Sequence, residues 1–300
     1  MTDEITLNDY SSDKDITQAQ AEKRLQEIVK KAEALGKQVP PVKLPKEDVD
    51  EAKALKIVIS RLEQAKYYEG EFQPDFTQLF LDESFLGGIS IGVSKRADFS
   101  VPTAYVGVRR NGNAYDVVLG FNPSFMRKLN KLQRAGVIRH ELYHLVFQHI
   151  FTRAIGDQRL ATLWNWATDL AINSIIGKDN LPTLCLIPGH RNIDPATGKP
   201  VEGIYADYIA NAPKMKASDH YFAELLKLMQ DNNHDEGDLT IGLNGDVGTM
   251  DDHSGWEDIP EEVKEEIRER VRELVGEGAM RADQNNSWGN TPQEIQEWIR

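Results

Sequence analysis

The sequence lacks the features of secreted, membrane-spanning and nucleic-acid-binding proteins. It has one cysteine, Cys185, so no intramolecular disulfide can form, which suits a reducing compartment. No uninterrupted apolar run is long enough to span a bilayer, and residues 1–10 lack the basic and apolar regions of a signal peptide. The sequence has 35 basic and 48 acidic residues, and the resulting net charge of −13 repels nucleic acid and anionic membranes. These absences predict a cytosolic protein that binds neither nucleic acid nor membrane.

The spacing of apolar residues predicts an α+β fold that is mostly helical. Hydrophobic residues make up 40% of the 300 residues, enough for a sizeable core. A period of two predicts a small antiparallel sheet, with strands around 89–93, 104–108 and 115–119. The Asn111-Gly112 pair favours a tight hairpin turn between the last two strands. Helical periods predict helices over about 16–35, 46–68, 135–155, 161–176, 205–210, 220–229 and 260–277. Strands followed by clustered helices indicate α+β rather than repeating βαβ units.

The same periods divide the chain into four parts. Residues 1–16 are a polar tail without period, which we expect to be disordered, and residues 17–85 form an N-terminal helical region. Residues 86–212 contain the predicted sheet and the most apolar helices, so we expect the core domain there. Residues 213–300 are acidic and helical.

The strongest functional signal is the segment His140-Glu141-Leu142-Tyr143-His144, an H-E-x-x-H pattern on a predicted helix. Residues four apart lie on one face of a helix, so both imidazoles can reach one zinc ion. Glu141 then lies beside the metal, where a carboxylate can take a proton from zinc-bound water. The rest of this helix is apolar, and buried polar side chains need partners. The pattern predicts one zinc per chain, with Glu141 as the general base.

A catalytic zinc needs a third protein ligand and one open position. Residues 163–176 are apolar on nearly every side, yet carry Asn165, Asp169 and Asn173 at successive four-residue steps. A buried carboxylate without a partner is costly, and a metal ion is one of the few partners that make it favourable. We therefore predict Asp169 as the third ligand, and Asn173 as a group that steadies Asp169 or a ligand histidine. The alternative is that Asp169 and Asn173 only hydrogen-bond a neighbouring helix.

Two further histidines are weaker candidates. On a continuous helix His149 lies half a turn away from His140, so its side chain would point in the opposite direction. No glycine interrupts the chain before Gly156, so we expect the helix to continue past His149. We interpret His149 as a core residue or a neighbour of the ligands. His253 lies in an acidic stretch that could fold over the zinc, although such loops are more often solvated.

These residues also carry a family resemblance. His140-Glu141-x-x-His144 with His149, followed by Trp164-Asn165-x-Ala167-x-Asp169-x-Ala171-x-Asn173, resembles the zincin-like metallopeptidase domains that precede von Willebrand factor A-like domains in bacterial and phage proteins. Further matches are Gly120-Phe121-Asn122-Pro123, Gly203-Ile204-Tyr205, and Asp251-Asp252-His253 with Trp256. The resemblance covers roughly residues 100 to 300 and is strongest over 140–173.

The resemblance implies a zincin-like fold and cooperation with a MoxR-type AAA+ ATPase. It also implies a C-terminal von Willebrand factor A-like domain after Arg300, and the helix opening at Thr291-Pro292-Gln293-Glu294 leads us to expect a chain that continues. A bacterial cytosol, or a host cytosol for a phage protein, is the expected location.

Residues and resemblance together predict a zinc metallopeptidase that cleaves a peptide or protein substrate. The hairpin over 103–119 is the expected partner for an extended substrate, which would pair with an edge strand. One alternative is a non-catalytic zinc-containing interaction module that works with the ATPase. Another is a zinc hydrolase that acts on a non-peptide amide.

Overall fold

The computed structural model describes residues 70–99, 101–111, 114–151, 157–183, 185–195, 197–232 and 261–300. The predicted helices over 16–35 and 46–68, the Gly112 turn residue and His253 lie outside these residues. The chain divides into two compact units, of which one comprises residues 1–72 and 96–100, and the other residues 73–95 and 101–300. In the part that the structure describes, no helix is both long and apolar enough to cross a membrane.

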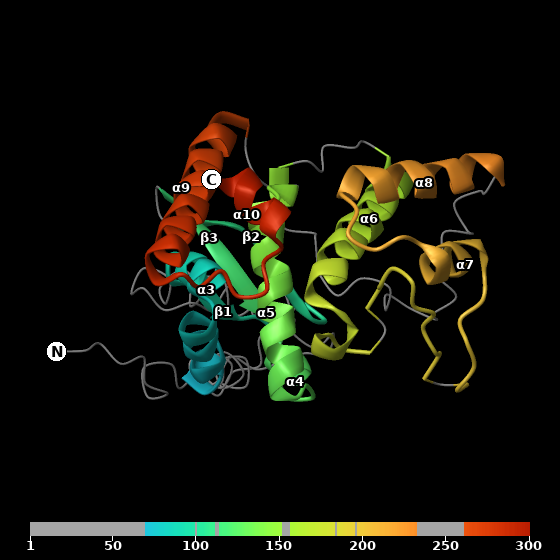
Figure 1. The fold of residues 1–300 in the computed structure, drawn as a ribbon, viewed down its shortest axis with the longest axis horizontal. Helices are drawn as coiled ribbons and strands as arrows, with labels where there is room; N and C mark the ends of the chain where they lie inside the picture. Colours follow the sequence, from blue (N-terminus) through green and yellow to red (C-terminus); the bar gives the residue numbers. More distant parts are fainter. Residues whose placement is uncertain are drawn as a thin grey trace, which may run out of the picture. The chain divides into compact units, whose positions relative to one another are not determined.

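The architecture is α+β and mostly helical, with one small sheet before the helix that carries His140 and His144 (Figure 1). Residues 70–82 are helical. The elements that follow are α3 (Ser84–Ile91), β1 (Ser94–Ala97), β2 (Ala104–Asn111), β3 (Ala114–Phe121), α4 (Pro123–Met126), α5 (Lys131–Val146), η2 (His149–Phe151), α6 (Gln158–Ile176), η3 (Lys178–Asn180), α7 (Ile204–Asn211), α8 (Ser218–Asp231), α9 (Glu261–Asn285) and α10 (Gln293–Ile299).

The sheet has the strand order β1-β3-β2 and is mixed rather than antiparallel throughout. Strands β2 and β3 pair antiparallel, from Ala104 opposite Phe121 to Asn111 opposite Ala114, which confirms the hairpin strands predicted from their alternation. The order of strands places β2 at one edge of the sheet. An edge strand offers its outer backbone groups to a further strand.

The strand predicted around residues 89–93 is wrong, because residues 84–91 form helix α3. Every residue of α3 except Ile91 is buried, so apolar residues at every second position do not mark one face. The polar residue between them is satisfied inside the helix, since the Ser90 hydroxyl donates to the Gly87 carbonyl at 2.8 Å. A fully buried short helix and a buried strand have similar sequence patterns, and tertiary burial decides between them.

Helix α5 begins at a capping box and ends earlier than predicted. The Asn130 side chain accepts from the Gln133 amide at 3.0 Å, and the Gln133 side chain accepts from the Asn130 amide at 3.1 Å. The helix ends at Val146, where the sequence predicted residue 155. Gln148 has a φ of 56° and turns the chain into η2. A residue in the left-handed conformation can end a helix even when it is not glycine. The absence of a glycine before Gly156 therefore did not mean that the helix continues.

Helix α6 confirms the apolar helix predicted over 161–176 and packs against both α5 and α8. It starts after Asp157, whose side chain accepts from the Arg159 amide at 2.8 Å, and it ends at Gly177, which has a φ of 81°. Gly136 lets α5 approach the chain just after α6, because a Cβ there would lie 1.8 Å from the Asn180 carbonyl oxygen. This close approach positions the two helices that carry the predicted ligands.

Helix α9 is longer than predicted, and the segment that follows it contacts α5. Helix α9 runs to Asn285, beyond the predicted end at 277, and packs against α3. Helix α10 confirms the helix opening at Thr291-Pro292-Gln293-Glu294 and has Pro292 at its N-cap. The Thr291 hydroxyl lies 3.1 Å from the Tyr143 hydroxyl, so this threonine joins the C-terminal segment to α5. The division of the chain at residues 85 and 212 stays a prediction.

Candidate metal centre

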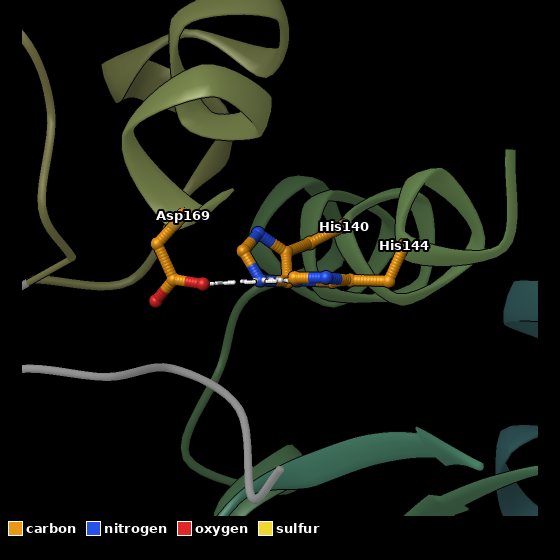
Figure 2. A group of neighbouring side chains, drawn as sticks. All are labelled: His140, His144 and Asp169. Carbon is orange, nitrogen blue, oxygen red and sulfur yellow. Dashed lines mark hydrogen bonds and ion pairs between the residues drawn. The ribbon is translucent and has the colours of Figure 1, made fainter. Parts of the chain in front are cut away.

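Three side chains predicted as ligands meet between α5 and α6. Figure 2 shows His140 and His144 on one helix, with Asp169 facing them from a second. Each side chain is 0 to 1% exposed, and one potential ligand atom from each residue lies within 4.8 Å of the others. The two Nε2 atoms are 3.0 Å apart, and Asp169 Oδ1 lies 3.5 Å from the His140 Nε2 and 3.7 Å from the His144 Nε2.

These separations fit a bound metal ion. Nitrogen and oxygen ligands about 2.0–2.2 Å from a tetrahedral zinc are roughly 3.3–3.6 Å from one another. The three observed distances bracket that range, so small side-chain adjustments would suffice for ligation. Two imidazoles and one carboxylate leave a fourth tetrahedral position for water or a substrate atom. The group is therefore a buried candidate metal site, built from a ligand set that zinc uses.

The charges around the site favour a cation. Asp169 and Glu141 are both buried at 0% exposure, and a buried carboxylate needs a cationic partner or hydrogen bonds. Burial by itself lowers the pKa of His140, but the polar groups around the ring, of which Asp169 contributes most, together outweigh burial and raise that pKa above its ordinary value. The charge on Glu141 adds to the rise. A metal ion bound to His140 would take the place of the proton that this environment favours.

Asn173 fixes which nitrogen of His140 carries a hydrogen. The Asn173 amide nitrogen donates to the Leu186 carbonyl at 2.9 Å, so the amide oxygen is the atom that faces His140. That oxygen lies 2.8 Å from the His140 Nδ1, which must therefore donate. In the neutral ring, the lone pair is then on Nε2, the atom that faces Asp169 and His144. Hydrogen bonds of this kind orient metal-binding histidines and set their tautomer.

His149 lies against the site, and the predicted direction of its side chain is wrong. The helix ends before it, and η2 turns the ring back so that its Nδ1 lies 3.1 Å from the Nδ1 of His144. The other ring nitrogen, Nε2, lies 3.1 Å from the Ser218 hydroxyl. Burial lowers the pKa of His149 to about 3, and the nearby His140 lowers it as well, so the ring is neutral.

Ser218 is the residue at this site that sequence reasoning missed. It is the first residue of α8, and it is 9% exposed. A serine at the start of a helix normally indicates a cap, and no local pattern connects it with a histidine 69 positions earlier. The packing of α8 against α6 brings the two together.

Comparison with known proteins agrees with the residues of the site. Residues 67–287 match the model of a family described as “Putative metallopeptidase domain”, a range that contains His140, Glu141, His144 and Asp169. This match confirms the resemblance to metallopeptidase domains noted from the sequence. No curated protein and no solved structure matches the chain.

Proposed function

We propose that this chain, which belongs to the family described as “Putative metallopeptidase domain”, is a zinc-dependent metallopeptidase. The observation that carries the proposal is the buried group of His140, His144 and Asp169, with ligand atoms within 4.8 Å of one another. Zinc fits this mixed nitrogen and oxygen set, because it accepts imidazole and carboxylate ligands in tetrahedral geometry. When bound, zinc supplies Lewis acidity, which lowers the pKa of a coordinated water to about 7 and polarises a carbonyl.

Glu141 is the proposed general base. It follows His140 directly in α5 and is fully buried, and its charge contributes to the electrostatics of the His140 ring. A carboxylate in this position can accept the proton of the attacking water and later deliver it to the leaving amine. The two histidines and Asp169 would hold the metal, while Asn173 keeps the His140 lone pair directed at it.

The proposed substrate is a peptide in extended conformation. Strand β2 is an edge strand of the sheet and packs against α5, the helix that carries both histidines. A peptide that adds to β2 as a further strand would gain backbone hydrogen bonds that do not depend on its side chains. This placement supports peptide bonds, rather than other amides, as the bonds cleaved.

Metal content tests the ligand set. Elemental analysis of the purified wild type should give one zinc per chain, and His144→Ala and Asp169→Ala should both lose it. Folding of each variant is checked by circular dichroism. Zinc retained in Asp169→Ala would contradict the ligand role of that carboxylate, and no zinc in the wild type after zinc addition would contradict the metal site itself.

Hydrolysis tests the catalytic role of Glu141. Glu141→Gln should keep zinc and fold normally, but should lose cleavage of a quenched-fluorescent peptide library that the wild type cleaves. A variant that cleaves as fast as the wild type would contradict the general base. A wild type that binds zinc yet cleaves no peptide would favour the non-catalytic interaction module, and capture of a MoxR-type ATPase would then be the next measurement.

A further inference from the structure

Both nitrogens of the His144 ring lie close to other imidazoles. Its Nε2 faces the candidate metal position, while its Nδ1 lies 3.1 Å from the Nδ1 of His149. Two ring nitrogens at this distance share one hydrogen, so one donates and the other accepts. A His144 ring that donates from Nδ1 has its lone pair on Nε2 and can bind a metal. A neutral His144 ring that accepts at Nδ1 carries its hydrogen on Nε2 and cannot.

From this geometry we infer that His149 and Ser218 are positioning residues, which hold His144 in its metal-binding tautomer. The inference rests on the proposed metal site. In this arrangement His144 Nδ1–H donates to His149 Nδ1, and His149 Nε2–H donates to the Ser218 hydroxyl oxygen, 3.1 Å away. The serine hydroxyl can either donate or accept, so this hydrogen-bonded relay of three side chains takes this direction when His144 Nε2 binds the metal rather than carrying a hydrogen toward the His140 Nε2, 3.0 Å away. His140 and His144 are then oriented by different groups, an amide for the first and this relay for the second.

The surroundings hold the His149 ring in the orientation that the relay needs. The ring is 4% exposed and packs against Phe147 at 5.6 Å and Trp164 at 6.1 Å between ring centroids. The Trp164 ring stands nearly perpendicular to it, at 83°. On the backbone, the left-handed Gln148 directs the chain back toward α5. Tight packing leaves the ring little freedom to turn its nitrogens elsewhere.

Ser218 connects the relay to a third helix. It belongs to α8, which packs against α6, the helix that supplies Asp169. His149 and Ser218 also line a cavity of about 610 Å³, together with Phe147, Trp164 and residues of α10. Ser218 lines this cavity, so a threonine, which keeps the hydroxyl, is the conservative variant at this position. This allows matched variants at both relay positions.

Zinc affinity tests the relay at His149. Measured by competition with a chromophoric chelator, the zinc affinity of His149→Leu should be about 10- to 100-fold lower than that of the wild type. This is the usual cost of losing a hydrogen bond that supports a metal ligand. Leucine fills the space but accepts no hydrogen bond. His149→Asn places an amide oxygen near the position of the lost Nδ1, so its affinity should stay within about fivefold of wild type. Equal affinities in the two variants would overturn the relay.

The serine gives an independent pair of variants. Ser218→Ala removes the acceptor for His149 Nε2–H and should weaken zinc binding, while Ser218→Thr keeps the hydroxyl and should bind as wild type does. Zinc affinity unchanged in Ser218→Ala would remove Ser218 from the relay. Because none of these readouts is hydrolysis, a wild type that binds zinc but cleaves nothing would contradict the peptidase and leave the relay intact. A wild type that binds no zinc would overturn both.

Nuclear magnetic resonance reads the direction of the relay without any substitution. Long-range ¹H–¹⁵N spectra of the zinc-loaded full chain should show a hydrogen on Nδ1 of His144 and on Nε2, not Nδ1, of His149. This result stands even if a His149 variant does not fold. A hydrogen on Nδ1 of His149 would reverse the direction of the relay and overturn the inference.

Discussion

Single side chains set the direction of each imidazole at the candidate metal site. Asn173 can orient His140 because both ends of its amide are used, one on the Leu186 carbonyl and one on the His140 ring. A side chain held at one end only could flip its amide and present a donor instead. The buried Asn173 thus orients the His140 ring, whereas the sequence stripe of Asn165, Asp169 and Asn173 predicted only that it steadies Asp169 or a ligand histidine.

Replacing Asn173 should weaken metal binding more than it weakens the fold. Asn173→Leu keeps the branched shape of the side chain but removes both hydrogen bonds, so zinc affinity should fall about 10- to 100-fold. Asn192→Leu is the matched control, because the Asn192 amide donates to the neighbouring Cys185 carbonyl at 3.2 Å. Chelator competition on both variants checks the prediction, and a loss of similar size in Asn192→Leu would show that the effect is not specific to His140.

Lys95 makes the stability of the chain depend on pH. Its ammonium donates to the Ser90 carbonyl and lies 5.6 Å from the centroid of the Phe76 ring, and burial lowers its pKa to about 8. Between pH 8 and the ordinary pKa of 10.5 the unfolded chain binds more protons at this residue, so its contribution to the free energy of unfolding rises with pH.

The pH effect is measured by urea unfolding at pH 7.5 and 9.5. The change in the free energy of unfolding between these pH values should be more positive for the wild type than for Lys95→Met, which lacks the titrating group. Lys227→Met, at an exposed position on α8, should behave like the wild type. The same pH dependence in the wild type and Lys95→Met would contradict the assignment.

At the scale of elements, the early end of α5 decides where His149 lies. The turn requires Gln148 in the left-handed region, which a side chain branched at Cβ adopts only with strain. Without this turn the helix would carry His149 to the opposite side of α5, as helical periodicity predicts. One residue of unusual backbone conformation therefore converts a residue of the far face into a neighbour of His144.

The effect of a substitution at Gln148 on the free energy of unfolding should depend on how readily the new residue adopts a positive φ. Gln148→Gly should leave the free energy of unfolding within about 1 kcal/mol of wild type, because glycine adopts a positive φ freely. Gln148→Val should lower it by about 1–3 kcal/mol, the cost of a strained backbone conformation. Urea unfolding monitored by circular dichroism measures both, and a valine variant as stable as the glycine variant would disprove the strain.

At the scale of the whole molecule, the C-terminal residues contact α3 and the helix that carries the motif, α5. The Ser84 amide donates to the Ser287 carbonyl at 3.0 Å, and the rings of Phe85 and Trp288 pack with centroids 4.8 Å apart. Thr291 contacts Tyr143, inside the H-E-x-x-H segment. Residues about 200 positions apart thus stabilise one core. Substitutions of buried residues in the C-terminal segment should therefore lower the free energy of unfolding of the whole core.

Trp288 should contribute strongly to stability, unlike a second tryptophan in the same segment. Trp288 is 7% exposed, whereas Trp298 is 63% exposed. Trp288→Ala should lower the free energy of unfolding by about 3–5 kcal/mol, the usual cost of removing a buried aromatic side chain. Trp298→Ala should lower it by less than about 1 kcal/mol. Urea denaturation compares the two, and equal losses would contradict the packing of Trp288 on α3.

The sequence by itself determined the features that depend on neighbours within one element. Helical spacing placed His140 and His144 on one face, the buried polar stripe singled out Asp169 and Asn173, and alternation predicted the β2–β3 hairpin. Only the tertiary structure decided that residues 84–91 are a buried helix, that His149 turns back, and that Ser218 lies beside it. The reason is that periodicity records which residues of one element share a face, whereas contacts between elements depend on packing and on backbone turns that no local pattern specifies.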